Sequence, residues 1–198
     1  MMTKKCILVS LTIFLWIFTT GCVQYIARYD GPYEGKIIDA ETRVPIEGVV
    51  VLGVWNNEAP TVAGAVSSYY DARETITDAK GDFKVPGKGL KILSDVGVMN
   101  VLIFKAGYEY IGLGTWEAFK EDSSFKVRWE GEKAIIPLRK LTMDQRRKEG
   151  MSPPLPPGEA PIEKVRLMLK EINKNAVEIG ADIIDTWNGG TVYEKTIR

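Results

Sequence analysis

The chain of 198 residues contains no histidine, and its only two cysteines, Cys6 and Cys22, lie near its beginning. Residues 23–198 therefore carry neither an imidazole nor a thiol. This absence excludes Ser-His-Asp and Cys-His catalysis, and it excludes a zinc site of the usual kind, which needs His or Cys ligands. A metal could be held only by oxygen ligands. The sequence accordingly predicts no catalytic residue, no metal site and no cofactor.

An excess of charge of one sign is also lacking, because 26 basic residues balance 26 acidic ones. No basic run with interleaved aromatic residues is present, so no field attracts nucleic acid and no nucleic-acid partner is expected. Apolar residues make up 45% of the chain and charged residues 26%, which is normal for a folded protein with a buried core.

The first 22 residues have the organisation of an export signal. Lys4 and Lys5 precede an uncharged, mostly apolar run over 6–20, which suits a signal peptide and is short for a membrane-spanning helix of roughly 20 residues. The following Thr19-Thr20-Gly21-Cys22 resembles a bacterial lipobox, although the family prefers Leu where Thr19 stands. The resemblance implies a lipoprotein signal peptide over 1–21, a lipid on Cys22 and a tether over 22–33. Ordinary signal cleavage and an uncleaved anchor are the alternatives.

The resemblance also implies a cellular location. It implies an exported protein that is anchored to the bacterial membrane by its N-terminal lipid. Val23 after the cysteine favours sorting to the outer membrane, with the protein on its periplasmic or surface face. An acyl anchor tethers a protein without spanning the bilayer.

The next hundred residues or so are rich in short β-strand patterns. Runs of β-branched or alternating apolar residues predict strands at 35–39, 49–55, 99–112, 125–129 and 133–141. The run at 49–55 is continuously apolar, which indicates a buried strand. Pro137 lacks an amide hydrogen, so its strand is expected to lie at an edge or to end there. Residues 56–71 are small and polar and predict a long loop.

The stretch "TITDAKGDFKV" at 75–85 predicts a β-hairpin. Asp78 is a preferred first residue of a type I turn, and Gly81 can adopt the left-handed conformation that closes it. A calcium loop is the alternative, but counted from Asp78 its third position is Lys80 and its sixth is Phe83, which do not match an EF-hand. Asp78 and Gly81 are therefore interpreted as structural turn residues.

Four of these motifs, taken in order, resemble the carboxypeptidase regulatory-like family. They are a Gly-apolar-Asp start, a Pro-Gly turn into a valine-rich strand, a Thr-Asp-x-x-Gly-x-Phe turn and a final Gly-Tyr. The matching residues are Gly35, Ile37, Asp39, Pro45, Gly48, Val49, Val51, Thr77, Asp78, Gly81, Asp82, Phe83, Gly107 and Tyr108. The resemblance implies a mainly β fold over 34–140, a transthyretin-like antiparallel β-sandwich, and a non-catalytic accessory role. The peptidase of the family's name needs histidine and is not implied.

The C-terminal part adds a predicted linker, helix and tail. Half of the ten prolines lie between Pro153 and Pro161, which predicts a Pro-rich linker over 141–160. Apolar residues at helical spacing predict an amphipathic helix over 161–180, ended by Gly180. It is expected to dock on the sandwich or on a partner. Residues 181–198 are a tail with a turn at 188–190.

The sequence favours a lipid-anchored envelope protein with a non-catalytic binding or structural module and a protein or glycan partner. The binding candidates are aromatic residues expected on exposed loops, a common location for contact residues: Tyr69, Tyr70, Tyr110 and Trp116. One alternative is an assembly factor that acts through the C-terminal helix. The other is a hydrolase that uses two carboxylates, with candidates Asp71, Glu74, Glu121 and Asp122.

Overall fold

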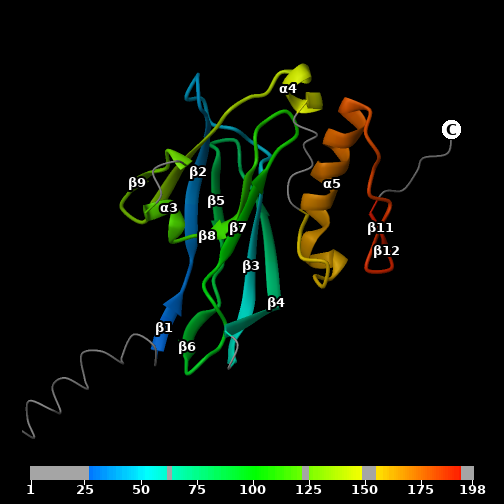
Figure 1. Ribbon diagram of the computed structural model, residues 1–198. Coiled ribbons are helices and arrows are strands. Elements are labelled where there is room, and N and C mark those ends of the chain that lie inside the picture. Colours follow the sequence, from blue (N-terminus) through cyan, green and yellow to red (C-terminus); the bar gives the residue numbers. More distant parts are fainter. Residues whose placement is uncertain (1–26, 62–63, 122–124, 149–154, 193–198) are drawn as a thin grey trace, which may run out of the picture.

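Two four-stranded β-sheets face each other in the computed structural model, which describes residues 27–61, 64–121, 125–148 and 155–192 (Figure 1). The first sheet has the order β5-β2-β10-β9, with bounds Asp82–Val85, Tyr33–Asp39, Lys133–Leu138 and Arg128–Glu130. The second has the order β4-β3-β7-β8, with bounds Gly64–Ile76, Val50–Thr61, Asn100–Phe104 and Ile111–Thr115. The predicted mainly β sandwich with a C-terminal helix is confirmed, but one strand pair, β2 with β10, is parallel.

Strand β3 lies at the centre of the molecule because both of its faces are covered. Val49, just before the strand, and Val51 and Trp55 within it belong to the core between the sheets. The alternate residues Val50 and Leu52 belong to a second core on the other face. A strand buried on both sides needs no polar residues, which explains the continuous apolar run at 49–55.

The second core lies between the outer face of the second sheet and helix α5, Ile162–Ile179 (Figure 1). Val165, Met168 and Leu169 are fully buried there. The helix ends at Gly180, which has a left-handed φ of 77°, as the sequence predicted. The structure therefore places the apolar face of the predicted helix on the sandwich.

The turn at 78–81 has the predicted local geometry. The amide of Gly81 donates to the carbonyl of Asp78 at 2.8 Å, and the Asp78 carboxylate accepts from the amides of Lys80 and Asp82 at 2.8 and 2.9 Å. The predicted hairpin is wrong, however, because β4 before the turn belongs to the second sheet and β5 after it to the first. The turn carries the chain from one sheet to the other.

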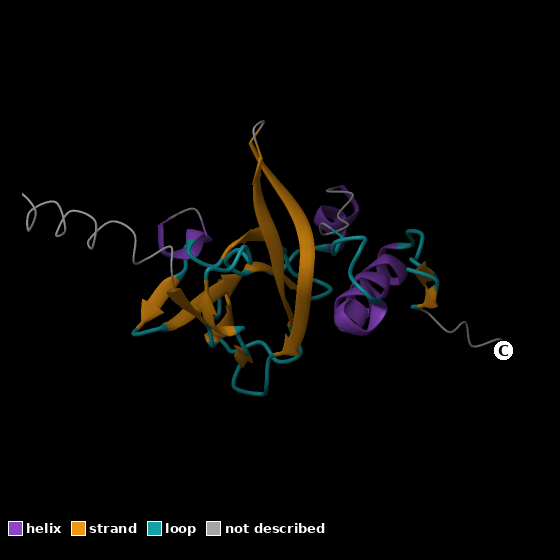
Figure 2. Cartoon of the chain, turned by 90° about the horizontal axis from the view of Figure 1, so that it is seen from below, coloured by secondary structure: helices purple, strands orange, loops and turns teal. Residues whose placement is uncertain are grey.

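The predicted loop at 56–71 is instead the outer half of a long two-stranded ribbon formed by β3 and β4. Figure 2 shows this ribbon standing out from the sandwich. Its pairing shifts at a bulge, since Trp55 lies opposite Asp71 while Asn56 lies opposite Tyr69. Tyr70 is thus the extra residue of the bulge. A ribbon outside the core buries neither face, so its small and polar composition looks like that of a loop.

Several boundaries also differ from the sequence predictions. Part of the predicted tether is strand β1, Ala27–Asp30, which pairs with β6, Gly89–Ile92. The predicted strand at 99–112 is two strands, β7 and β8. Pro137 lies in a strand with neighbours on both sides, but β9 pairs only with residues 133–135, so the β9 side of Pro137 is unpaired.

The shorter elements complete the described part of the chain. Helix α3, Ala118–Glu121, precedes β9, and helix α4, Met143–Lys148, forms inside the predicted linker. Thr142 and Gln145 exchange side-chain-to-amide hydrogen bonds at its start, the capping-box arrangement. The tail forms a small hairpin of β11, Thr186–Trp187, and β12, Gly190–Thr191. None of the helices in the described ranges has the length and apolar character needed to span a bilayer.

Candidate functional site

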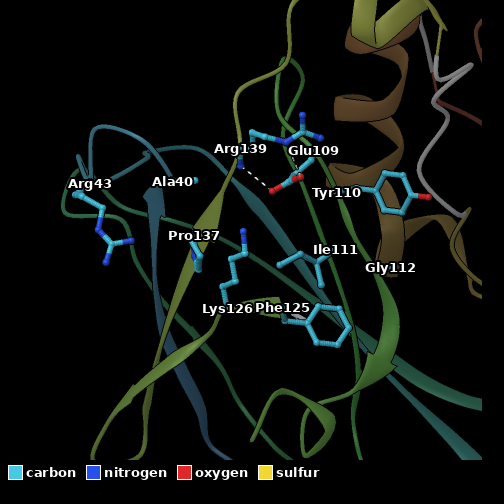
Figure 3. A pocket seen from close by; sticks show the side chains of 10 residues that line it. All are labelled: Ala40, Arg43, Glu109, Tyr110, Ile111, Gly112, Phe125, Lys126, Pro137 and Arg139. Carbon is cyan, nitrogen blue, oxygen red and sulfur yellow. Dashed lines mark hydrogen bonds and ion pairs between the residues drawn. The ribbon is translucent and has the colours of Figure 1, made fainter. Parts of the chain in front are cut away.

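A cavity of about 380 Å³ opens at the end of the sandwich where β2 and β10 end and β8 begins. Its apolar side is formed by Ile111, Phe125 and Pro137 (Figure 3). Charged side chains from three separate segments surround it: Arg43 from the connection after β2, Lys126 from the segment before β9, and Arg139 directly after β10. A concave, partly apolar site with a few converging polar groups is the usual form of a small-ligand site.

The charges at this cavity are not balanced. The lining contains three cationic side chains and one carboxylate, that of Glu109. Glu109 accepts from the amide and from Nε of Arg139, at 2.9 and 3.2 Å. Arg43 and Lys126 have no hydrogen-bond or ion-pair partner among the described side chains. Among the described residues, the cavity therefore carries two positive charges without an ion-pair partner beside an apolar wall.

The backbone positions both of these cations in an uncommon conformation. Arg43 has a φ of 64° and Lys126 a φ of 53°, in the left-handed region that non-glycine residues rarely adopt. Arg43 donates its amide to the carbonyl of Asp39 at 3.0 Å, and the Asp39 carboxylate accepts from the amides of Glu41 and Thr42. The amide of Thr42 is the main reason that the pKa of Asp39 is lowered. Residues held in this region cluster at active sites and ligand-binding sites.

Tyr110, a predicted binding residue, contributes to the lining of this cavity and is 36% exposed. Its ring, however, points away from Glu109 and Ile111 in Figure 3. Consecutive residues of an extended segment alternate sides, which accounts for this direction. The structure thus places Tyr110 at the cavity's edge, and its ring does not fill the cavity.

Trp116, another predicted binding residue, is not on an exposed loop. It is only 5% exposed and lies in the core between the sheets, with its ring centre 5.5 Å from that of Tyr33 and 5.7 Å from that of Trp129. The expectation of exposure is therefore wrong, because the indole is needed to fill the core. Trp116 also contributes to the lining of a second cavity of about 420 Å³, whose charged lining is mostly glutamate.

The remaining predicted aromatic residues lie on β4. Tyr70 at the bulge is 43% exposed, and its ring centre lies 5.7 Å from the Lys88 ammonium and 5.3 Å from the Lys91 ammonium. Tyr69 points to the other face and packs against the second core. Its hydroxyl is buried without a hydrogen-bond partner in the described residues, and burial raises its pKa. The structure does not bring the four predicted residues into one site.

Lys88 forms a structural cluster beside Tyr70. Its side chain is 6% exposed, it is ion-paired with Asp71, and its ammonium lies 4.4 Å from the ring centre of Trp55. Burial lowers the pKa of Lys88 although the Asp71 carboxylate favours the charged form. Asp71 is also 3.2 Å from Lys164 of α5. The cluster therefore holds β4, the segment before β6 and α5 together.

The three described carboxylates among those named for a hydrolase do not form a pair. Asp71 binds two lysines, and Glu74 accepts hydrogen bonds from amides of α5. Glu121 is exposed, and Asp122 lies outside the described residues. Within the described ranges no group of three or more His, Cys, Asp or Glu side chains could hold a metal ion.

The lipidation candidate Cys22 also lies outside the described residues. Comparison of the chain with protein-family models, with curated proteins and with solved structures finds no match.

The cations of the cavity were not predicted from the sequence. They come from three distant segments with no common spacing, and only the fold brings them together.

Proposed function

We propose that this chain is a lipid-anchored envelope lipoprotein whose β-sandwich is a non-catalytic module that binds an acidic ligand. The single observation that carries the binding role is the cavity lined by Arg43, Lys126 and Arg139, where three cations and one carboxylate contribute to the lining. Arginine and lysine donate charge-assisted hydrogen bonds to carboxylate and phosphate oxygens. The apolar wall with Phe125 would contact the uncharged part of the same ligand, for example the ring face of an acidic sugar.

The anchoring part of the proposal depends on the sequence before the described residues. A basic start, an apolar run and Gly21-Cys22 have the order of a lipoprotein signal. The carboxypeptidase regulatory-like family is the proposed relationship of the sandwich, and the mainly β fold is compatible with it. Fold alone does not decide function, so the binding role depends on the cavity.

The structural partners of the acidic residues support a non-catalytic role. The buried or half-buried carboxylates Asp71 and Glu74 have structural partners, and the chain has no histidine. The alternative of an assembly factor that acts through the C-terminal helix is less well supported. The apolar face of α5, including Met168 and Leu169, already covers the second sheet.

Isothermal titration calorimetry with glucuronate tests the binding role, with glucose as the uncharged comparison. We expect heat of binding for glucuronate alone. Because the Arg43 side chain has no hydrogen-bond or ion-pair partner among the described residues, Arg43→Glu reverses a charge at the cavity without breaking an internal ion pair, and it should abolish binding. Arg128→Glu changes an exposed arginine on β9 outside the cavity lining and should leave binding unchanged. Equal heats from Arg43→Glu and wild type would contradict the assignment.

Metabolic labelling with a fatty-acid analogue tests the anchor. Wild type should incorporate the label and Cys22→Ala should not, because the lipid would be attached to that thiol. Equal labelling of the two proteins would refute lipidation at Cys22 without bearing on the cavity.

A further inference from the structure

The small antiparallel ribbon of β1 and β6 has one entirely apolar face. The register places Ala27 opposite Ile92 and Tyr29 opposite Leu90. Side chains alternate along a strand, and directly paired residues share a face. These four side chains therefore lie on one face of the ribbon.

The other face of the ribbon is fixed against the body of the protein. Arg28 donates from Nη2 to the carbonyl of Gly97 at 2.7 Å and also to the carbonyl of Val96. Asp30 at the end of β1 is buried. Because these contacts use the inward face, the apolar face must point outward.

The outward face is unusually exposed for its composition. Tyr29 is 72% exposed, Leu90 63% and Ile92 59%, and the neighbouring Leu93, at a φ of 45°, is 78% exposed. Single exposed apolar residues are common, but Tyr29, Leu90 and Ile92 are adjacent on one face, as at a contact surface, and Leu93 directly follows the strand. We call Tyr29, Leu90, Ile92 and Leu93 the ribbon patch.

The position of the ribbon patch along the chain indicates its partner. Ala27 follows Cys22 by five positions in the chain, and an extended chain spans at most about 3.3–3.6 Å per residue. A lipid on Cys22 would thus hold the ribbon within about 18 Å of the anchor's attachment point. Tyrosine is enriched at the headgroup level of membranes, and aliphatic side chains enter the acyl boundary.

We propose that the ribbon patch is a membrane-docking surface that inserts into the headgroup region of the bilayer beside the anchor. This inference rests on the proposed lipidation of Cys22. The contact would orient the protein on the membrane surface, which an anchor on Cys22 alone does not do.

The orientation has a consequence for the acidic-ligand cavity. Strand β2 begins three residues after β1 and ends at Asp39, close in sequence to Arg43. In Figure 1 the ribbon lies at the lower end of β2 and the connection that follows β2 lies at its upper end. A seven-residue strand spans about 23 Å. The cavity therefore faces away from the membrane, toward ligands in the surrounding compartment.

Photocrosslinking of the full-length protein in vesicles tests the proposal. The protein is reconstituted into phosphatidylethanolamine and phosphatidylglycerol vesicles that contain a trace of headgroup-biotinylated phosphatidylethanolamine. Tyr29 or Leu93 is replaced by p-benzoylphenylalanine, and biotin transferred to the protein is measured after irradiation. The matched control replaces Lys170, an exposed residue of α5. In Figure 1 helix α5 lies apart from β1 and β6, on the other side of the second sheet.

We expect positions 29 and 93 to yield at least about tenfold more lipid adduct than position 170, since only an inserted side chain reaches the lipids. Equal yields at the three positions, or a dimer crosslinked through position 93 without lipid adduct, would overturn the proposal. Fatty-acid labelling of Cys22 is measured in parallel. An acylated protein without adducts at 29 and 93 refutes the ribbon patch alone, whereas adducts in a protein that is not acylated refute the anchor alone.

Discussion

Glu74 of β4 accepts a hydrogen bond from the amide of Met168, 94 residues later in the chain, at 2.6 Å, and another from the amide of Leu167 at 2.9 Å. These two bonds join the second sheet to the helix that covers it. Burial nevertheless dominates the ionisation of this carboxyl and raises the pKa of Glu74 from 4.5 to about 7. The contact is therefore sensitive to pH near neutrality.

The first prediction concerns the pH dependence of stability. Between pH 4.5 and about 7 the folded protein holds a proton on Glu74 that the unfolded chain has released. The stabilisation linked to Glu74 is thus fully present below about pH 4.5, falls as pH rises, and is lost above about pH 7. Relative to Glu74→Gln, the free energy of unfolding of wild type should fall by about 2 kcal/mol across this range.

Urea denaturation of wild type and Glu74→Gln at several pH values measures this difference. Glu163→Gln, at an exposed carboxylate in the first turn of α5, is the control and should run parallel to wild type. A constant difference between wild type and Glu74→Gln from pH 4.5 to 8 would contradict the prediction.

The second prediction tests how α5 packs on the sheet. Leu169 is fully buried, while Leu167, two residues before it, is 40% exposed. Leu169→Ala should lower the free energy of unfolding by about 2–5 kcal/mol, because it removes buried apolar contacts and leaves a cavity. Leu167→Ala should change it by less than about 1 kcal/mol. Equal effects of the two substitutions in chemical denaturation would mean that α5 does not dock in this orientation.

The sequence predicted those parts of the fold that depend on local chemistry. The turn at 78–81 was found because Asp78 and Gly81 have conformational preferences that act within four residues. The pairing of the following strand was not found, because β5 pairs with β2, more than forty residues earlier. Long-range pairing leaves no signal in a short window of sequence, so two strands beside a good turn were taken for a hairpin.

The candidate site was less predictable than the fold. Arg43, Lys126 and Arg139 are exposed cations in unrelated segments, a description that fits many surface residues. The aromatic residues were more conspicuous in the sequence, but Trp116 fills the core and Tyr69 packs under α5. In the sequence, an aromatic residue of the core looks the same as one at a binding site, and only its burial in the structure distinguishes the two.

The third prediction concerns Gly81. Its φ is 74°, and a Cβ added there would lie 2.5 Å from the carbonyl oxygen of Ile37. Both the conformation and the space therefore exclude a side chain. Gly81→Val should lower the free energy of unfolding by about 2–4 kcal/mol, measured by chemical denaturation.

The neighbouring Asp82 provides the control for the turn. Its carboxylate is 2.9 Å from the Lys133 ammonium, and both side chains are about one third exposed. Asp82→Asn should therefore cost no more than about 1 kcal/mol. Calcium should leave the melting temperature unchanged in wild type and in this variant. A calcium-dependent rise that Asp82→Asn abolishes would show that the turn is a metal site after all.

The last prediction concerns Asp30, which links the ribbon of β1 and β6 to the core. Its buried carboxylate accepts from the Tyr33 hydroxyl at 2.6 Å, from Nε1 of Trp55 at 2.9 Å and from the amide of Lys88 at 2.7 Å. Burial, together with the negative charge of Asp30, raises the pKa of Tyr33, so this hydroxyl remains a donor. Three donors thus point at the Asp30 carboxylate. A side chain that accepts hydrogen bonds on both of its terminal atoms is needed to pair with all three.

Asp30→Asn places an NH2 donor beside the donors that paired with the carboxylate. It also removes the negative charge that lies 3.8 Å from Arg28. We expect a loss of about 2–4 kcal/mol in the free energy of unfolding, measured by guanidinium denaturation. Tyr33→Phe removes one donor and leaves the carboxylate with two, so it should cost about 1 kcal/mol. Asp95→Asn, at an exposed site near the ribbon, should stay within about 0.5 kcal/mol of wild type. If Asp30→Asn were as stable as Asp95→Asn, the carboxylate would not be what holds the ribbon to the core.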